Sequence, residues 1–132
     1  MSDNSATPFS SLVLIAEDEP VIRSLLQVLL ERRGLRVLVA SDGLEALTLY
    51  QEHSDEISLV ITDLNMPRLD GPGLVRRLTE LSGHVRIIVT SGLPEMIDEM
   101  RRIWGQDIVL LPKPYDANDL AQALERAKVV AA

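Results

Sequence analysis

The sequence contains no cysteine, and this absence excludes several kinds of chemistry at once. Disulfide bonds, iron–sulfur clusters, thiolate zinc sites and thiol catalysis all require cysteine side chains. Lysine is also scarce: the chain has two lysines, Lys113 and Lys128, against eleven arginines. The chemistry that remains open to this chain uses carboxylates, hydroxyls and very few amines.

Long apolar runs and concentrated positive charge are missing as well. The longest uninterrupted apolar segment, residues 12–16, is far shorter than the roughly 20 residues that cross a bilayer, and no secretory signal is visible at the start. Twenty acidic and thirteen basic residues give a formal net charge of −7, and the basic residues are scattered. Because nucleic-acid binding needs a concentrated positive surface, we expect no direct DNA or RNA binding. Because a bilayer-length apolar run and a secretory signal are both missing, we expect no membrane association and a cytoplasmic location.

The 132 residues have the size of one domain, and their pattern alternates between two kinds of segment. Continuous apolar runs of strand length predict a sheet covered on both faces; they are residues 12–16, 35–40, 57–62, 85–90 and 108–111. Segments with helical spacing follow each run. This alternation predicts a single α/β domain over residues 11–132, with a parallel sheet and right-handed crossovers, after a loose tail at residues 1–10.

Local signals set the ends of the five expected helices. Helix starts are expected at Pro20, Asp42, Gly73, Pro94 and Asp116, and glycine ends three of these helices, at Gly34, Gly83 and Gly105. The apolar stripes predicted to face the sheet include Leu25, Leu26 and Leu30 on the first helix, Leu44, Leu47 and Tyr50 on the second, and Ile97, Met100 and Ile103 on the fourth.

Polar side chains follow four of the five predicted strands. Glu17 and Asp18 come after the first, Asp63 and then Asn65 after the third, Thr90 and Ser91 at the end of the fourth, and Lys113 after the fifth. Because the carboxyl ends of parallel strands share one edge of a sheet, we expect these groups to lie together. Each has a plainer interpretation alone, such as a helix cap for Asp18 or Glu19 and a turn for Asp63. Repetition at four strand ends favours a functional site.

These residue types point to metal-assisted phosphoryl chemistry. Carboxylates brought together in a partly dehydrated cleft repel one another unless a cation joins them. Mg²⁺ suits a site with few carboxylates, since it retains waters and takes its remaining ligands from phosphate. A screened aspartate oxygen could then attack phosphorus, while an ammonium and a hydroxyl hold the phosphoryl oxygens. The pattern predicts a metal-dependent phosphoaspartate at Asp63.

The ordered set of residues resembles the response-regulator receiver domains of two-component signalling, of the kind found in chemotaxis regulators. The likeness covers residue 12 to about residue 130. It rests on Glu17-Asp18, the D-L-N-M-P segment at 63–67, Thr90-Ser91 and Lys113-Pro114. It implies a flavodoxin-like, doubly wound sheet of five parallel strands in the order 2-1-3-4-5 with five helices. It also implies a signalling switch that catalyses only its own phosphotransfer and dephosphorylation.

The resemblance implies a role for each matching residue. Asp63 would accept the phosphoryl group, and Thr90 and Lys113 would contact the phosphoryl oxygens. Mg²⁺, or Mn²⁺, would be held by Glu17, Asp18, Asp63 and the backbone carbonyl of Asn65, with Glu17 acting largely through bound water. The same resemblance implies a cis peptide bond between Lys113 and Pro114.

Three positions depart from the common pattern of the family. Glu17 stands where the family often has aspartate. Leu110 lies three residues before the lysine, where many receivers carry a tyrosine or phenylalanine that rotates on activation, so that form of switching is not open to this chain. Pro112 has no amide hydrogen, which an edge strand tolerates and a central strand does not.

The implied partners are a histidine kinase or a histidine phosphotransfer protein as donor, and a downstream protein target or an attached output domain. Homodimerisation stays open, as does the choice between a stand-alone regulator and the receiver of a larger kinase. Three rival interpretations remain. A small phosphatase with an aspartate nucleophile usually has a second acid where Asn65 stands. A nucleotide or flavin module would place a phosphate beside Glu17, Asp18 and Glu19, whose negative charges repel it in the absence of a metal ion. A pseudo-receiver would serve only for docking.

Overall fold

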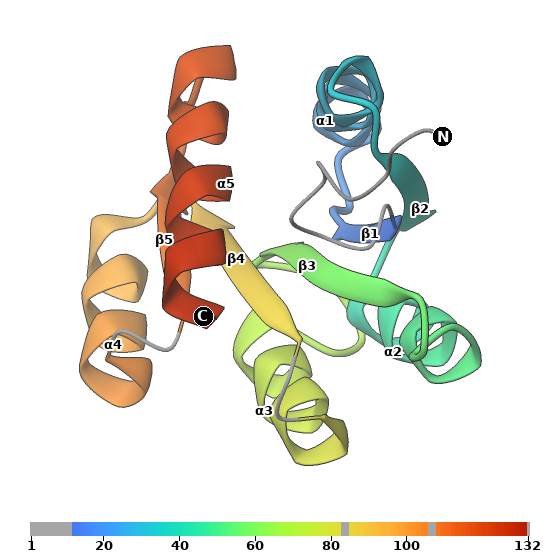
Figure 1. Ribbon diagram of the computed structural model, residues 1–132. Helices are drawn as coiled ribbons and strands as arrows, with labels where there is room; N and C mark the ends of the chain where they lie inside the picture. The colour runs from blue at the N-terminus through green and yellow to red at the C-terminus, as the bar shows by residue number, and fades with distance from the viewer. Residues whose placement is uncertain (1–11, 83–84, 106–107, 132) are drawn as a thin grey trace.

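The computed structural model describes residues 12–82, 85–105 and 108–131 (Figure 1). The strands are β1 (Leu12–Ala16), β2 (Arg36–Ala40), β3 (Ile57–Asp63), β4 (Arg86–Ser91) and β5 (Val109–Pro112). The helices are α1 (Pro20–Arg32), α2 (Gly43–Glu52), α3 (Gly71–Leu81), α4 (Pro94–Trp104) and α5 (Ala117–Ala131). The predicted alternation is confirmed, with small shifts at the ends. The predicted tail at residues 1–10, and Gly83 as the end of the third helix, lie outside the described residues.

The five strands form one parallel sheet in the order β2-β1-β3-β4-β5. This is the flavodoxin-like order that the resemblance implied. β5 lies at an edge of the sheet, and its last residue, Pro112, pairs with Ser91 of β4. A residue without an amide hydrogen is therefore accommodated where the topology predicted.

Helices cover both faces of the sheet, α1 and α5 on one and α2, α3 and α4 on the other (Figure 1). Alternate side chains of a strand point to opposite faces, so the sheet feeds two hydrophobic cores. In β1, Val13 and Ile15 belong to the core under α1 and α5, whereas Leu14 and Ala16 belong to the other core. Burial on both faces explains why the strands read as continuous apolar runs.

The predicted apolar stripes on the helices are confirmed only at their centres. Leu26, Leu30, Leu47, Tyr50, Ile97 and Met100 are buried. Leu25, Leu44 and Ile103 are exposed, so their assignment to the sheet-facing side is wrong. Each lies at the margin of its stripe, where a side chain on a cylindrical helix points sideways rather than toward the sheet.

Two of the expected helix starts, at Asp42 and Asp116, carry capping hydrogen bonds. Asp42 Oδ1 accepts from the Glu45 N–H at 2.8 Å at the start of α2. Asp116 Oδ1 accepts from the Asp119 N–H at 2.8 Å just before α5, and the Asp119 carboxylate accepts from the Asp116 N–H at 3.1 Å. At α1 the N-cap residue is Glu19, whose side chain makes no capping hydrogen bond. Capping by Glu19 therefore does not account for the acidic run after β1.

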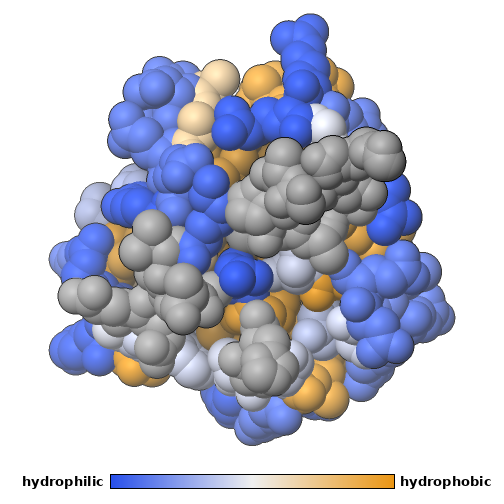
Figure 2. Space-filling model, viewed as in Figure 1, coloured by the Kyte–Doolittle hydropathy of each residue, from blue (hydrophilic) through white to orange (hydrophobic). Residues whose placement is uncertain are grey.

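Hydrophilic residues cover much of the described surface on the side shown in Figure 2, with smaller hydrophobic areas between them. The large apolar side chains that stay exposed are spread over several elements; they are Val21, Leu25, Val28, Leu44, Leu81, Leu93 and Ile103. Within the described ranges, no helix has both the length and the apolar character needed to span a membrane.

Candidate functional site

The parallel register brings four strand ends to one edge of the sheet. Ala16, the last residue of β1, pairs with Thr62, and Asp63, the last residue of β3, pairs with Thr90 of β4. The chain beyond β5 stays attached to β4, since the Lys113 N–H donates to the Ser91 carbonyl at 2.8 Å. The predicted convergence of these strand ends is therefore what the structure shows.

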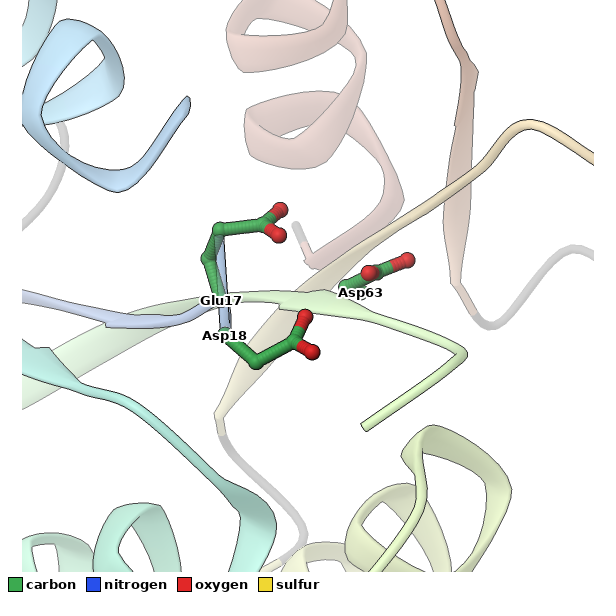
Figure 3. A group of neighbouring side chains, drawn as sticks. All are labelled: Glu17, Asp18 and Asp63. Carbon is green, nitrogen blue, oxygen red and sulfur yellow. The ribbon is translucent and has the colours of Figure 1, made fainter. Parts of the chain in front are cut away.

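Three carboxylates gather at this edge. Glu17, Asp18 and Asp63 each offer one carboxylate oxygen, and these atoms lie within 4.8 Å of one another. Figure 3 shows Glu17 and Asp18, from the end of β1, directing their carboxylates toward the side of the site where Asp63 projects from the end of β3. Glu17 and Asp63 are only 2% and 6% exposed, and Asp18 is the most accessible of the three. The cluster thus combines two buried acids with a third that solvent reaches more easily.

A single ammonium bridges the two buried acids. Lys113 Nζ lies 3.1 Å from Glu17 Oε1 and 3.3 Å from Asp63 Oδ2, and the lysine side chain is itself only 16% exposed. One positive charge thus faces two buried carboxylates and a third nearby. The carboxylate cluster therefore has more negative than positive charge, and a further cation would balance it.

The pKa values at the site follow from this crowding. Burial raises the pKa of Glu17, and repulsion by Asp63 raises it further. Burial also raises the pKa of Asp63, although the Lys113 ammonium and the Asn65 N–H act in the opposite direction. Burial alone would lower the pKa of Lys113, but attraction to Asp63 and Glu17 outweighs it, so the pKa of Lys113 is raised. Lys113 therefore stays charged, and ionising both acids is unfavourable unless more positive charge is present.

Several hydrogen bonds fix the segment that carries Glu17. Its N–H donates to the Ala40 carbonyl at 3.1 Å, and its carbonyl accepts from Arg23 Nη1 at 2.9 Å. Glu17 Oε2 also accepts from the Glu19 N–H at 3.2 Å. Arg23, one turn into α1, was not identified from the sequence, where it is one arginine among eleven with no motif around it.

The two hydroxyl residues at the end of the fourth strand, Thr90 and Ser91, make different contacts. Thr90 is buried beside Asp63, as the register of β3 and β4 requires. Ser91 Oγ accepts from the Leu93 N–H at 3.0 Å, so this side chain shapes the turn into α4. For Ser91 the plain structural interpretation fits the structure, and Thr90 remains the hydroxyl candidate of the site.

The loop after β3 supports Asp63 with backbone groups. The N–H groups of Leu64 and Asn65 favour the charged form of the Asp63 carboxylate and so act against the rise in its pKa, and the Leu64 N–H donates to the Thr90 carbonyl at 3.0 Å. Asn65 itself is exposed, two residues beyond Asp63. The Lys113–Pro114 peptide bond is cis, as the resemblance implied.

A pocket of about 180 Å³ adjoins the site between the start of α4 and the end of β5. Ser91, Pro112 and Lys113 contribute to its walls. The Lys113 side chain thus borders both the carboxylate cluster and an opening toward solvent.

The residues fit a hard divalent cation. The donors are all oxygens, two of the three carboxyls have raised pKa values, and their oxygens are close enough to share one ion. Small ions such as Mg²⁺ bind through one or two carboxylates and complete their shell with water or phosphate. Asp18 is the donor that solvent reaches most easily.

Comparison with known proteins bears directly on this site. The family described as the response regulator receiver domain matches residues 13–125. The chain is 31% identical over 119 residues to the response regulator receiver protein CpdR of Brucella abortus (strain 2308), covering 90% of this chain and 98% of CpdR. A solved response regulator receiver domain protein from Clostridium thermocellum superposes with a TM-score of 0.82 at 31% identity, covering 90% of this chain and 94% of that one.

A second relative is much longer than this chain. The sensor kinase CckA of Brucella abortus (strain 2308) is 35% identical over 118 residues, which are 88% of this chain and 12% of the kinase. The solved receiver domain of the hybrid histidine kinase CckA superposes with a TM-score of 0.74 at 33% identity, covering 89% of this chain and 98% of that domain. The same fold therefore occurs in a protein of this length and as a small part of a larger one.

Proposed function

The chain belongs to the response regulator receiver domain family, a component of two-component signalling, and we propose that it is a phosphorylation switch with Asp63 as its acceptor. The observation that carries this proposal is the surrounding of the Asp63 carboxylate. It is buried at the end of β3, with Lys113 Nζ 3.3 Å away and carboxylate oxygens of Glu17 and Asp18 within 4.8 Å. A nucleophile, a cation for the phosphoryl group and donors for a metal ion are thereby assembled in one place.

In this proposal Glu17, Asp18, Asp63 and the backbone carbonyl of Asn65 hold Mg²⁺ or Mn²⁺. When bound, such an ion neutralises negative charge on the acceptor and on the incoming phosphoryl group. Asp18 and Asp63 are the stronger candidates for direct contact. Both oxygens of Glu17 already accept hydrogen bonds, from Lys113 and from the Glu19 N–H, so Glu17 would contact the ion largely through bound water.

The transfer step uses groups already in the site. An Asp63 oxygen attacks the phosphorus of a phosphohistidine; a P–O bond forms, the P–N bond breaks, and its electron pair stays on the imidazole nitrogen. The Lys113 ammonium and the Thr90 hydroxyl hold phosphoryl oxygens. The names of the relatives, a sensor kinase and a receiver protein, support a histidine kinase or a histidine phosphotransfer protein as donor.

The signal leaves the site through β4, α4, β5 and α5. New charge on Asp63 draws Thr90 and Lys113 inward and biases an equilibrium between two arrangements of these elements. A protein target, or an attached output domain, binds one arrangement better; a preference of about 100-fold corresponds to about 2.7 kcal/mol. Leu110 pairs with Val89 in the register of β4 and β5 and packs on the core, so the shift proceeds without a rotating aromatic ring.

The direct test is incubation with acetyl phosphate and Mg²⁺ followed by intact-mass measurement. We expect the mass of one phosphate on the wild-type protein, and none when the metal is chelated or in Asp63→Asn. Asp55→Asn, an exposed aspartate before β3, is the matched control and should be labelled like the wild type. Equal labelling of Asp63→Asn would refute the acceptor assignment, and repeated turnover of a small phosphomonoester would favour the phosphatase interpretation instead.

A further inference from the structure

The loop that follows the proposed acceptor, residues 64–70, rests on the start of α2. Arg68 Nε lies 3.1 Å from Asp42 Oδ2. The other oxygen of the same carboxylate, Oδ1, caps α2 by accepting from the Glu45 N–H at 2.8 Å. Asp42 therefore has one oxygen for its own helix and one for the loop after β3.

Two backbone features show how closely the loop and α2 are fitted. A Cβ atom on Gly43 would lie 1.8 Å from the Leu69 carbonyl oxygen, so the chains approach too closely for any larger residue. Arg68 has a φ of 72°, a left-handed conformation that costs free energy for a residue with a side chain. The loop holds this conformation while its arginine is paired with Asp42.

The other end of the loop is joined to the acceptor itself. The Gly71 N–H donates to the Leu64 carbonyl at 3.0 Å. A Cβ atom on Gly71 would lie 2.6 Å from the Asp63 carbonyl oxygen and 2.5 Å from Leu64 Cα. The loop is therefore packed tightly at both ends, against α2 at Leu69 and against the end of β3 at Gly71.

We propose that Asp42 and Arg68 are positioning residues, which hold loop 64–70 so that Asp63 and the Asn65 carbonyl stand in the geometry that a metal ion requires. The expected change in metal affinity rests on the proposed function of the site. The expected change in the hydrogen exchange of loop 64–70 does not, because it depends only on the Asp42–Arg68 ion pair.

When Arg68 is replaced, the loss of its charge and the loss of loop positioning are expected to change the Mg²⁺ affinity in opposite directions. Removing the Arg68 charge makes the surroundings of the carboxylates more negative, so charge alone would strengthen Mg²⁺ binding. Loss of positioning would weaken it, by about threefold for a partly exposed ion pair. Positioning also predicts that the double variant binds no more weakly than either single variant, because both remove the same contact.

The test compares Arg68→Asn, Asp42→Asn and the double variant with Arg101→Gln. Asparagine tolerates a positive φ and also caps helices, so both substitutions remove the ion pair with little other change. Arg101 is the control because its side chain is 60% exposed, against 59% for Arg68, and is likewise paired with an aspartate, Asp98. Amide hydrogen exchange of residues 64–71 is measured in metal-free protein, and Mg²⁺ affinity by calorimetry at constant ionic strength.

We expect faster exchange in loop 64–70 and about threefold weaker Mg²⁺ binding in both variants, with Arg101→Gln unchanged. Unchanged exchange, or tighter Mg²⁺ binding by Arg68→Asn, would overturn the positioning role. A wild-type protein that binds no Mg²⁺ would contradict the proposed function, and the exchange rates would still decide whether the pair holds the loop.

Discussion

At the scale of single residues, the two lysines differ in the burial of the acids that they contact. It is the cation between Glu17 and Asp63, both nearly inaccessible to solvent. Lys128, by contrast, pairs with an exposed glutamate, Glu125, at 2.8 Å. The same side chain thus serves in a buried charge network at one position and on a solvated helix face at the other.

We predict that Lys113→Met lowers the free energy of unfolding of the metal-free protein by about 3 kcal/mol at pH 7.5, because it leaves two buried carboxylates without a counter-charge. Methionine keeps the apolar stem in place. Urea denaturation checks this value. The loss should shrink as the pH falls, since Glu17 and Asp63, whose pKa values burial already raises, then take up protons.

Lys128→Met is the control for that measurement and should change the stability by less than about 0.5 kcal/mol, the usual contribution of an exposed pair. Equal losses in the two lysine variants would mean that the contacts of Lys113 with Glu17 and Asp63 stabilise the protein no more than an exposed ion pair does.

The candidate site residues that could be predicted from the sequence are those whose position is set by topology. Asp63, Thr90 and Lys113 lie at or just past the ends of predicted strands, and parallel strands must end at one edge. Arg23 and Arg68 escaped notice because each reaches a carbonyl or carboxylate of another segment. Their contacts depend on how loops pack in three dimensions, which hydrophobic periodicity does not encode.

At the scale of elements, the position of α3 is set by a close contact with the end of β3. Asp70 caps this helix by accepting from the Gly73 N–H at 2.9 Å, and Pro72 stands in its first turn. The helix therefore begins at Gly71, two residues before the predicted start at Gly73. The capping bond makes Asp70 the N-cap, so residues 71–73 belong to the first turn of the helix itself.

We predict that Gly71→Ala destabilises the protein by about 2 kcal/mol, although alanine favours helices, because its Cβ would meet backbone atoms that cannot move independently. Those atoms are Leu64 Cα at 2.5 Å and the Asp63 carbonyl oxygen at 2.6 Å. Thermal unfolding of the metal-free protein tests this.

Gly92→Ala is the matched substitution, since its Cβ would meet only Lys113 Cβ at 3.9 Å, an ordinary contact. It should unfold within about 0.5 kcal/mol of the wild type, as other substitutions without a new clash do. A Gly71→Ala protein as stable as Gly92→Ala would show that α3 can shift away from β3 at little cost.

The start of α5 gives a second prediction at this scale. Asp116→Ala removes the side chain that accepts from the Asp119 N–H, and we expect a loss of about 1 kcal/mol in the free energy of unfolding. Asp116→Asn, which keeps a capping oxygen, should recover most of it. If alanine and asparagine behave alike in urea denaturation, the cap contributes little and packing of Leu120 and Leu124 alone holds the helix.

At the scale of the whole molecule, the stability of the fold and the proposed metal binding make opposite demands on the carboxylate cluster. The net charge is −7, and the fold concentrates three of its acids at one edge of the sheet with one lysine between two of them. A carboxyl whose pKa is raised by folding stabilises the folded state only while it is protonated. Stability is therefore lost as the pH rises from the ordinary values of 3.8 for Asp63 and 4.5 for Glu17 through their raised values. The raised pKa of Lys113 acts only at alkaline pH, outside this window.

From this balance we predict that Asp63→Asn is more stable than the metal-free wild type by about 1–2 kcal/mol at pH 8, because it removes a buried charge that the fold does not fully compensate. The advantage should shrink toward pH 4, where Asp63 is increasingly protonated. Mg²⁺ at about ten times its dissociation constant should return about 1.4 kcal/mol to the wild type at pH 8 and less to the variant. Urea denaturation at pH 5 and pH 8, with and without Mg²⁺, measures all three effects. A variant less stable than the wild type at pH 8 would mean that Lys113 already compensates Asp63 fully, and the strain that makes the site ready for a cation would not exist.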